Sequence, residues 1–263
     1  MSGKWPGGFI TKDAPEVVGP VDGEGGSAPG IWTLDQVADY ERQGLWPKPV
    51  LNAELYAWGR NSNGQLGLGD VTNRSSPVQV GALTTWKKVA QGGSFSIAVK
   101  KDGTLWTWGS NTTYGQLGLG DKINRSSPVQ VGALTTWEEP SAGDLHTAAI
   151  KTDGTLWMWG DNPWGQLGQN NTTDYSSPVQ VGTLTNWYKV GCGQQFTAAV
   201  KTNGTLWAWG RNQSGQLGQN NTTNRSSPVQ VGALTTWAQI YVGNETVLAV
   251  KTDNTLWTWG SNL

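Results

Sequence analysis

Short apolar runs that alternate with polar residues recur along most of the chain. In residues 96–108, two alternating segments flank Asp102-Gly103. Asp-Gly between such segments is a strong sign of a β-hairpin, because these residues tolerate the positive φ angles of a type I′ turn. A period of two places Trp106 and Trp108 on the same face of the second strand. We expect one face of this strand to be buried between neighbouring sheets.

The hairpin belongs to a tandem repeat of about 50 residues. Leu-(Tyr/Trp)-x-Trp-Gly occurs five times, with its second aromatic residue at steps of 50, 51, 50 and 50. Gly-Gln-Leu-Gly, Ser-Ser-Pro-Val-Gln-Val-Gly and a further tryptophan each recur four times in the same register. Two shorter strands are predicted at 77–80 and 86–90, which gives four strands per unit. This is the pattern of propeller blades, so we predict an all-β, propeller-like array of four four-stranded blades plus an extra strand.

The number of predicted strands does not fit a simple closed ring. Five Trp-Gly strands, the first at 55–59, accompany only four sets of the other three strands. The array is therefore an open arc, or the spare strand begins a half-blade, or it pairs with another chain. An open arc exposes sheet faces and edges at both ends, so we expect a homo-oligomer.

The first 54 residues differ from the array at 55–263. Residues 1–30 are rich in glycine and proline and are predicted to form an extended arm. Residues 31–54 contain one predicted short helix and a linker, with Thr33 and Gln36 as a capping box and Gly44 at the helix end. The apolar residues of this segment need a surface to pack against. We predict that six of them dock the chain to a partner: Trp32, Leu34, Val37, Tyr40, Leu45 and Trp46.

Composition narrows the classes of function. The formal net charge is -1, and this near-neutral balance argues against a nucleic-acid partner. No apolar run approaches the roughly 20 residues of a membrane span, so no membrane insertion is expected. The single cysteine excludes an intramolecular disulfide, and the single histidine excludes a zinc site with several such ligands. We predict no metal and no cofactor.

No set of residues in the sequence supports catalysis. His146 has no recognisable nucleophile or carboxylate partner, and Cys192 has no separate base, so both are predicted to be structural. The glycine-rich loops lack the P-loop motif and fit turn geometry instead. Aspartates of separate units could converge on a calcium ion, but their spacing matches no known calcium loop. An enzyme such as a glycan hydrolase would need paired carboxylates, and the repeats show no consistent pair. We predict no catalytic residue.

Positions that differ between units are the candidates for binding. Arginine and aromatic residues are favoured in interfaces, and several occupy variable loop positions. We predict that these form a binding rim: Arg74, Tyr114, Arg125, Trp164, Tyr175 and Arg225. A second variable stretch covers residues 87–95, 138–146, 188–196 and 238–246. A constant scaffold with one changing edge is expected of a binding surface, and neutral drift explains the same pattern.

The repeat resembles that of the regulator of chromosome condensation family. The resemblance rests on Leu-Trp-x-Trp-Gly, Asn-x-x-Gly-Gln-Leu-Gly-Leu-Gly-Asp, Ser-Ser-Pro-Val and the Lys-x-Asp-Gly hairpin, and it covers about 80% of the chain. It implies a β-propeller, typically with seven blades, and this chain departs from that number. The family includes nucleotide-exchange and enzyme-inhibitor members. One hypothesis is therefore a free protein-binding or regulatory propeller.

A second resemblance concerns residues 28–47. Ala-Pro-Gly-Ile-Trp-Thr-Leu-Asp-Gln-Val-Ala-Asp-Tyr, followed by Gln-Gly-Leu-Trp-Pro, is similar to a segment of virion structural proteins of tailed phages, especially marine ones. It implies a component of the phage particle. Our leading hypothesis is that this chain is a non-enzymatic virion protein, and that its N-terminal arm docks it to other virion proteins. The array would then serve as a decoration, a tail or fibre part, or a module that contacts a host glycan or receptor.

Overall fold

The computed structural model describes residues 54–82 and 85–261. The chain divides into two compact units, Met1–Leu51 and Asn52–Leu263, and the described residues belong to the second. No helix within the described ranges has the length and apolar character of a membrane span. The predicted arm, the predicted helix and its docking residues lie outside the described part of the chain and stay predictions: Trp32, Leu34, Val37, Tyr40, Leu45 and Trp46.

The described residues contain strands of four types, named here by their order within a repeat. First strands are β3 (Trp86–Gln91), β7 (Trp137–Ala142), β11 (Trp187–Cys192) and β15 (Trp237–Val242). Second strands are β4 (Phe95–Lys100), β8 (His146–Lys151), β12 (Phe196–Lys201) and β16 (Thr246–Lys251). Third strands are β1 (Tyr56–Gly59), β5 (Leu105–Gly109), β9 (Leu156–Gly160), β13 (Leu206–Gly210) and β17 (Leu256–Gly260). Fourth strands are β2 (Arg74–Gln79), β6 (Arg125–Gln130), β10 (Tyr175–Gln180) and β14 (Arg225–Gln230).

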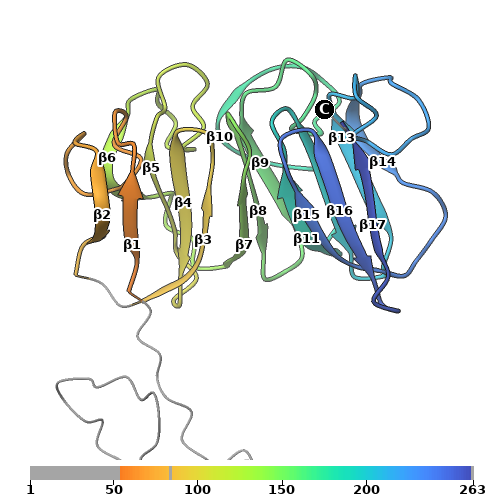
Figure 1. Cartoon of the computed structure of the whole chain (residues 1–263), viewed down its shortest axis with the longest axis horizontal. Coiled ribbons are helices and arrows are strands. Elements are labelled where there is room, and N and C mark those ends of the chain that lie inside the picture. Colours follow the sequence, from red (N-terminus) through yellow and green to blue (C-terminus); the bar gives the residue numbers. More distant parts are fainter. Residues whose placement is uncertain (1–53, 83–84, 262–263) are drawn as a thin grey trace, which may run out of the picture. The chain divides into compact units, whose positions relative to one another are not determined.

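These strands form five antiparallel sheets. Sheet 1 is β1-β2, sheets 2 to 4 are β3–β6, β7–β10 and β11–β14, and sheet 5 is β15-β16-β17. Strand contacts join sheet 2 to 3, 3 to 4 and 4 to 5. In Figure 1 sheet 1 lies at the left, sheet 3 in the middle, and sheets 4 and 5 overlap at the right. The predicted all-β array of repeated four-stranded blades is confirmed. The grouping of strands differs from our expectation, because each fourth strand pairs with the third strand before its loop. Over the described residues, the spare strand β1 therefore begins a half-blade, and sheet 5 lacks a fourth strand.

The hairpin between second and third strands forms as predicted, but its turn does not. Gly103 has φ +78°, and its N–H donates to Lys100 O at 3.0 Å. Asp102 keeps a negative φ, so this is a type I turn followed by one left-handed residue, and the type I′ prediction was wrong. The Asp102 carboxylate accepts from the Thr104 N–H at 3.0 Å and from the Thr104 hydroxyl at 2.6 Å. In the last hairpin Asn254, at φ 65°, takes the place of the glycine.

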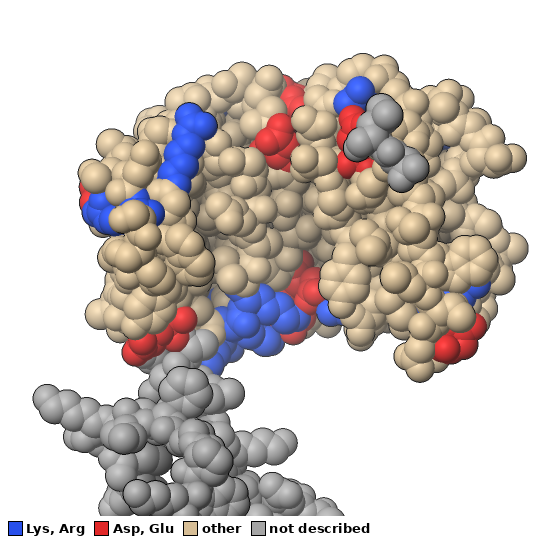
Figure 2. All heavy atoms as spheres, viewed as in Figure 1, with Lys and Arg blue, Asp and Glu red and all other residues tan. Residues whose placement is uncertain are grey.

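The second strand of each inner sheet is buried on both faces, and so is most of the third strand, where we expected one buried face. All residues of β4, β8 and β12 are buried, and both Leu156 and Trp159 of β9 are fully buried although they point to opposite faces. The end sheets differ, because Trp58 in sheet 1 is 60% exposed and Leu256 in sheet 5 is 63% exposed. The described array is therefore open at both ends. Charged side chains gather at its two turn-bearing edges, and the face between them is mostly uncharged (Figure 2).

A loop from each sheet fastens the next sheet. The indole N–H of Trp159 in sheet 3 donates to Gln116 O at 2.9 Å, and the Thr147 hydroxyl donates to the same oxygen at 2.7 Å. Gln116 lies in the loop between β5 and β6 of sheet 2, so these bonds join two sheets. Gly118 of that loop lies flat against the indole, where an added Cβ would meet Trp159 Nε1 at 2.6 Å. The same bond recurs in the other units, as Trp108–Gln65, Trp209–Gln166 and Trp259–Gln216.

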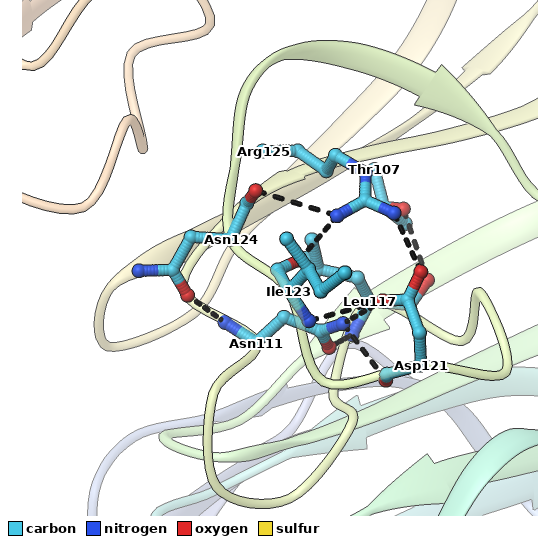
Figure 3. Close-up of polar contacts among 7 residues, drawn as sticks. All are labelled: Thr107, Asn111, Leu117, Asp121, Ile123, Asn124 and Arg125. Carbon is cyan, nitrogen blue, oxygen red and sulfur yellow. Dashed lines mark hydrogen bonds and ion pairs between the residues drawn. The ribbon is translucent and has the colours of Figure 1, made fainter.

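One asparagine holds each of these loops in shape (Figure 3). Asn111 is fully buried, and its Oδ1 accepts from the Leu117 N–H at 2.9 Å. Its Nδ2 donates to Asp121 O and to Asp121 Oδ1, both at 3.0 Å, and its own N–H donates to Asn124 Oδ1 at 2.7 Å. The loop has no regular secondary structure, and these side-chain bonds satisfy its backbone instead. Asn61, Asn162 and Asn212 do the same in the other loops.

Gly118, which contacts the Trp159 indole, is expected to tolerate a side chain less well than Gly132, which has open space around it. Gly132 has φ +60° with open space around it, whereas Gly118 combines φ +72° with contact to the Trp159 indole. We predict that Gly132→Ala lowers the free energy of unfolding by about 1 kcal/mol through backbone strain alone. Gly118→Ala is predicted to lower it by about 3 kcal/mol or more, because the indole must also move. Urea unfolding of both variants tests this, and equal losses would contradict the role given to this contact.

Candidate protein-interaction surface

The first strands β3, β7, β11 and β15 form one continuous surface along the array. Each is an edge strand of its sheet, and each contacts the first strand of the next sheet. We call their exposed residues the first-strand surface. The variable stretches at 87–95, 138–146, 188–196 and 238–246 cover these strands, the turns that follow them and the first residue of each second strand. The structure thus brings residues about 50 positions apart in the sequence onto a single surface.

A network of ion pairs crosses three sheets of this surface. Lys87 Nζ lies 2.5 Å from Glu138 Oε2, and Lys88 Nζ lies 3.2 Å from Glu138 Oε1. Lys88 also pairs with Glu139, whose other oxygen lies 2.9 Å from Lys189 Nζ. Basic and acidic atoms adjoin one another at the lower edge of the array in Figure 2. Lysines on sheets 2 and 4 therefore flank the glutamates on sheet 3.

The network favours the charged forms of Glu138 and Lys88. A hydrogen bond from Lys87, and then bonds and charge from Lys88, hold the pKa of Glu138 below its usual range in spite of partial burial. Burial opposes the charge of Lys88, but hydrogen bonds to Glu139 and Glu138 outweigh it and raise the pKa of the ammonium. The Lys87 and Glu138 side chains are 40% and 35% exposed, so solvent screens their pairs. Such pairs add little to stability.

Aromatic residues accompany these charges. Tyr188 is 52% exposed and Tyr241 is 59% exposed, both on first strands. A hollow of about 540 Å³ lies beside the network, and its lining includes Glu139 and Tyr188. Exposed aromatic residues next to fixed charges are typical of protein-binding surfaces.

Three of the predicted rim residues are arginines at the start of fourth strands. Arg74 Nη2 lies 2.5 Å from Asp70 Oδ2, and Arg125 Nη2 lies 2.5 Å from Asp121 Oδ2 (Figure 3). Each arginine thus closes its own loop onto the aspartate four residues earlier. Arg225 is half-buried, and its Nε is enclosed without a hydrogen-bond partner. Their role in binding stays a prediction.

The three aromatic rim residues are each half-buried. The Tyr175 hydroxyl accepts from Asn171 Nδ2 at 3.1 Å, and its ring packs on two core clusters. Trp164 lies under the Arg211 guanidinium, 5.6 Å from the ring centre, and Arg211 pairs with Glu245 at 2.9 Å. Tyr114 occupies the equivalent turn of sheet 2. The structure does not bring these residues together with the first-strand network, so the two sets are separate candidates.

The single histidine and the single cysteine are both buried, and their structural role stays a prediction. His146 is fully buried, burial lowers its pKa to about 3, and its Nε2 lies 3.1 Å from the Thr197 hydroxyl. Burial raises the pKa of Cys192 to about 12, so it stays a thiol. Among residues 54–82 and 85–261, no group of three or more His, Cys, Asp or Glu side chains is placed to hold a metal ion.

The surroundings of the Asp161 carboxylate disfavour its ionised form. It is 3% exposed. Burial, followed by the nearby carboxylates of Asp174 and Asp144, raises its pKa from 3.8 to about 6, although Gln166 donates a hydrogen bond to it at 2.9 Å. The folded state therefore binds the proton more tightly than the unfolded state. The ionised form costs stability that develops as pH rises above 3.8 and is complete above about 6.

Asp161→Asn removes this cost. We predict that the variant is more stable than the wild type by about 2 kcal/mol at pH 7, and that the gap nearly closes at about pH 4. Asp153→Asn is the control, because hydrogen bonds from Thr155 lower the pKa of Asp153 and its loss is expected to destabilise at pH 7. Urea unfolding at both pH values measures the gap. A gap that does not change with pH would contradict the burial of a charge at Asp161.

Comparison with known proteins places these repeats in a family. The model of the regulator of chromosome condensation (RCC1) repeat matches residues 52–99, 102–150, 153–200 and 203–250. A second model of the same repeat matches residues 86–116 and 187–216. The matches begin at residue 52, so the resemblance of residues 28–47 to phage virion proteins stays a prediction.

Individual relatives share only part of their length with this chain. The ultraviolet-B receptor UVR8 of Arabidopsis thaliana is 39% identical over 116 residues, which is 42% of this chain and 26% of that protein. The probable E3 ubiquitin-protein ligase HERC6 of Homo sapiens is 39% identical over 119 residues, which is 42% of this chain and 12% of that protein. The structure of Prp20p from Saccharomyces cerevisiae superposes with a TM-score of 0.70 at 23% identity, covering 86% of this chain and 56% of Prp20p. The repeats match along most of the chain and the fold agrees, so this protein belongs to the regulator of chromosome condensation (RCC1) repeat family.

Proposed function

We propose that this chain is a non-enzymatic protein-binding module that holds its partner on the first-strand surface. The main support is the contrast between constant and variable strands. Every fourth strand contains Ser-Ser-Pro-Val-Gln, whereas the first strands are Trp-Lys-Lys-Val-Ala-Gln, Trp-Glu-Glu-Pro-Ser-Ala, Trp-Tyr-Lys-Val-Gly-Cys and Trp-Ala-Gln-Ile-Tyr-Val. Repeated sheets need no such differences in order to stack, and position-specific residues suit recognition of a partner.

The chemistry of the surface favours a protein partner with charges of both signs. Lys87 and Lys88 on sheet 2, the glutamates of sheet 3 and Lys189 on sheet 4 alternate in sign along the row. Exposed tyrosines on β11 and β15 supply apolar contact area. A partner with complementary charges would be oriented by the network and held by the tyrosines.

The relatives support a binding role. The structural study of Prp20p describes its binding to Gsp1p and histones, and another structure shows Kap60 bound to Prp20. Those partners are not transferred to this chain, because identity to these structures is 23% or less. HERC6 is named as a ubiquitin ligase, but the match spans 12% of it, so ligase activity is not transferred either.

This proposal takes up the second of our two hypotheses from the sequence. The virion role, the virion location and the virion or host partners depend on residues 28–47, outside the described part of the chain. The named relatives are receptors, ligases and binding proteins, so they support the free binding module better.

Affinity capture with matched variants tests the proposal. The full chain is immobilised as wild type, Lys88→Glu, Tyr188→Ala and Lys122→Glu, and partners from the source cells are quantified by mass spectrometry. Lys122 is exposed in the β5–β6 loop, away from the first strands, so Lys122→Glu controls for the change of charge. We predict a partner retained by the wild type and the control and reduced roughly tenfold or more by the other two.

Two outcomes would contradict this account. Equal capture by all four proteins would mean that the first-strand surface does not bind the partner. Loss of the partner on deletion of residues 1–51, which form a separate unit, would instead favour docking through the N-terminal segment.

A further inference from the structure

The two end sheets are incomplete in complementary ways. Sheet 5 contains first, second and third strands, and within the described residues the outer edge of β17 has no partner. Sheet 1 contains only a third strand, β1, and a fourth strand, β2. We propose that a second copy of this chain completes sheet 5, with β17 of one copy pairing with β2 of the other in the place now held by β1.

The sequences of these strands specify the pairing. β17 is Leu-Trp-Thr-Trp-Gly, identical to β5, and β2 is Arg-Ser-Ser-Pro-Val-Gln, identical to β6. β5 and β6 already pair with each other in sheet 2, so β17 and β2 can form the same ladder. The residues that would face one another across the two copies are Trp257 and Gln79, Thr258 and Val78, and Gly260 and Arg74. β1 pairs with β2 in this same register, so β17 can replace it without moving β2.

β1 is held more weakly than β17. β1 has four residues and, among the described residues, pairs with β2 alone, whereas β17 pairs with β16 over five positions. Trp58 of β1 is 60% exposed. Each of the four Gln-Leu-Gly loops in the described chain accepts a hydrogen bond from a tryptophan of the following sheet, and none of these bonds involves Trp58. Trp259 of β17 does bond such a loop, at Gln216 O. When β17 replaces β1 beside β2, the contacts that are lost are therefore those of the more weakly held strand, β1.

The exposed faces also fit one another. In sheet 5, Leu248 is 38% exposed and Leu256 is 63% exposed, although the residues at these positions in sheets 2 to 4 are fully buried under the next sheet. In sheet 2, Val89 is 54% exposed, whereas its equivalent Val190 is 8% exposed beneath the first and second strands of sheet 3. Sheet 1 has no first or second strand to cover Val89, and sheet 5 has both. Each end thus carries the surface that the other end lacks.

A second copy, and not the same one, is the occupant that the structure favours. In Figure 1 sheet 1 lies at the left and sheet 5 at the right, with β3, β4 and sheet 3 between them in this view. Two copies arranged head to tail would form two equal junctions, after which no end stays open. Each copy would contribute sheets 2 to 4 and a completed sheet 5, so the dimer would be a closed ring of four-stranded sheets.

Mass measurement tests the stoichiometry. Light scattering after size exclusion of the full chain is expected to give twice the 28.2 kDa of one chain. Leu256→Glu is expected to raise the dimer dissociation constant by roughly tenfold or more, because the residue would be buried in the junction. Leu134→Glu is the control, because Leu134 is 49% exposed in a loop away from both ends. Both changes are at exposed positions of the single chain, so both variants should fold.

Cysteine pairing tests the strand exchange itself. A chain with Val78→Cys is mixed with a chain with Thr258→Cys and oxidised, since directly opposed residues in such a ladder lie within disulfide distance. Native Cys192 is buried as a thiol and stays out of the reaction. A disulfide between the two chains, absent when either variant is oxidised alone, is the expected result. A monomeric wild type, the absence of this disulfide from the mixture, or its formation within a single doubly substituted chain would overturn the proposal.

Discussion

The bond from the third-strand tryptophan of one sheet to the loop of the sheet before it is the constraint on which the array depends. An indole N–H that is buried without a hydrogen-bond acceptor is costly. For Trp159 and Trp209 the loop of the preceding sheet supplies the acceptor, which is the Gln116 carbonyl and the Gln166 carbonyl, respectively. The loop must bring its backbone against the ring, which explains the glycine at 118. The sheets are thereby joined in a chain, each to the next.

This constraint separates the residues that must repeat from those that are free to differ. The loop, the third strand and the fourth strand all belong to the junction, and their sequences are nearly constant. First strands lie at the edge of each sheet, where Lys88 and Glu139 meet across a sheet boundary without supporting the tryptophan bond. Variation is tolerated there, which makes the first strands the place where a partner surface can develop on a fixed scaffold.

The sequence predicted the sheets because period, turn residues and tryptophan positions all agree. It could not assign the fourth strands, because the loop before Arg125 could equally lead out of a sheet or back into it, and only the structure shows that it leads back. The predicted rim included Arg74, whose guanidinium forms an ion pair with Asp70. The spacing of four residues between the two side chains was the sequence feature that could have indicated this pair. The sequence contains opposite charges at one repeat position, Lys88 and Glu139, which was a sign of the first-strand network. That these charges meet in one network depends on which strands are neighbours, and only the structure shows this.

Hydrogen exchange in two matched variants tests the junction most directly. Trp159→Phe removes the bond to Gln116 O between sheets 2 and 3, and Trp157→Phe removes a bond to the Thr155 hydroxyl within one hairpin. The account predicts that Trp159→Phe reduces amide protection both in the β5–β6 loop of sheet 2 and in sheet 3, while Trp157→Phe affects only its own hairpin. Equally local changes in both variants would contradict the claim that this bond joins the sheets.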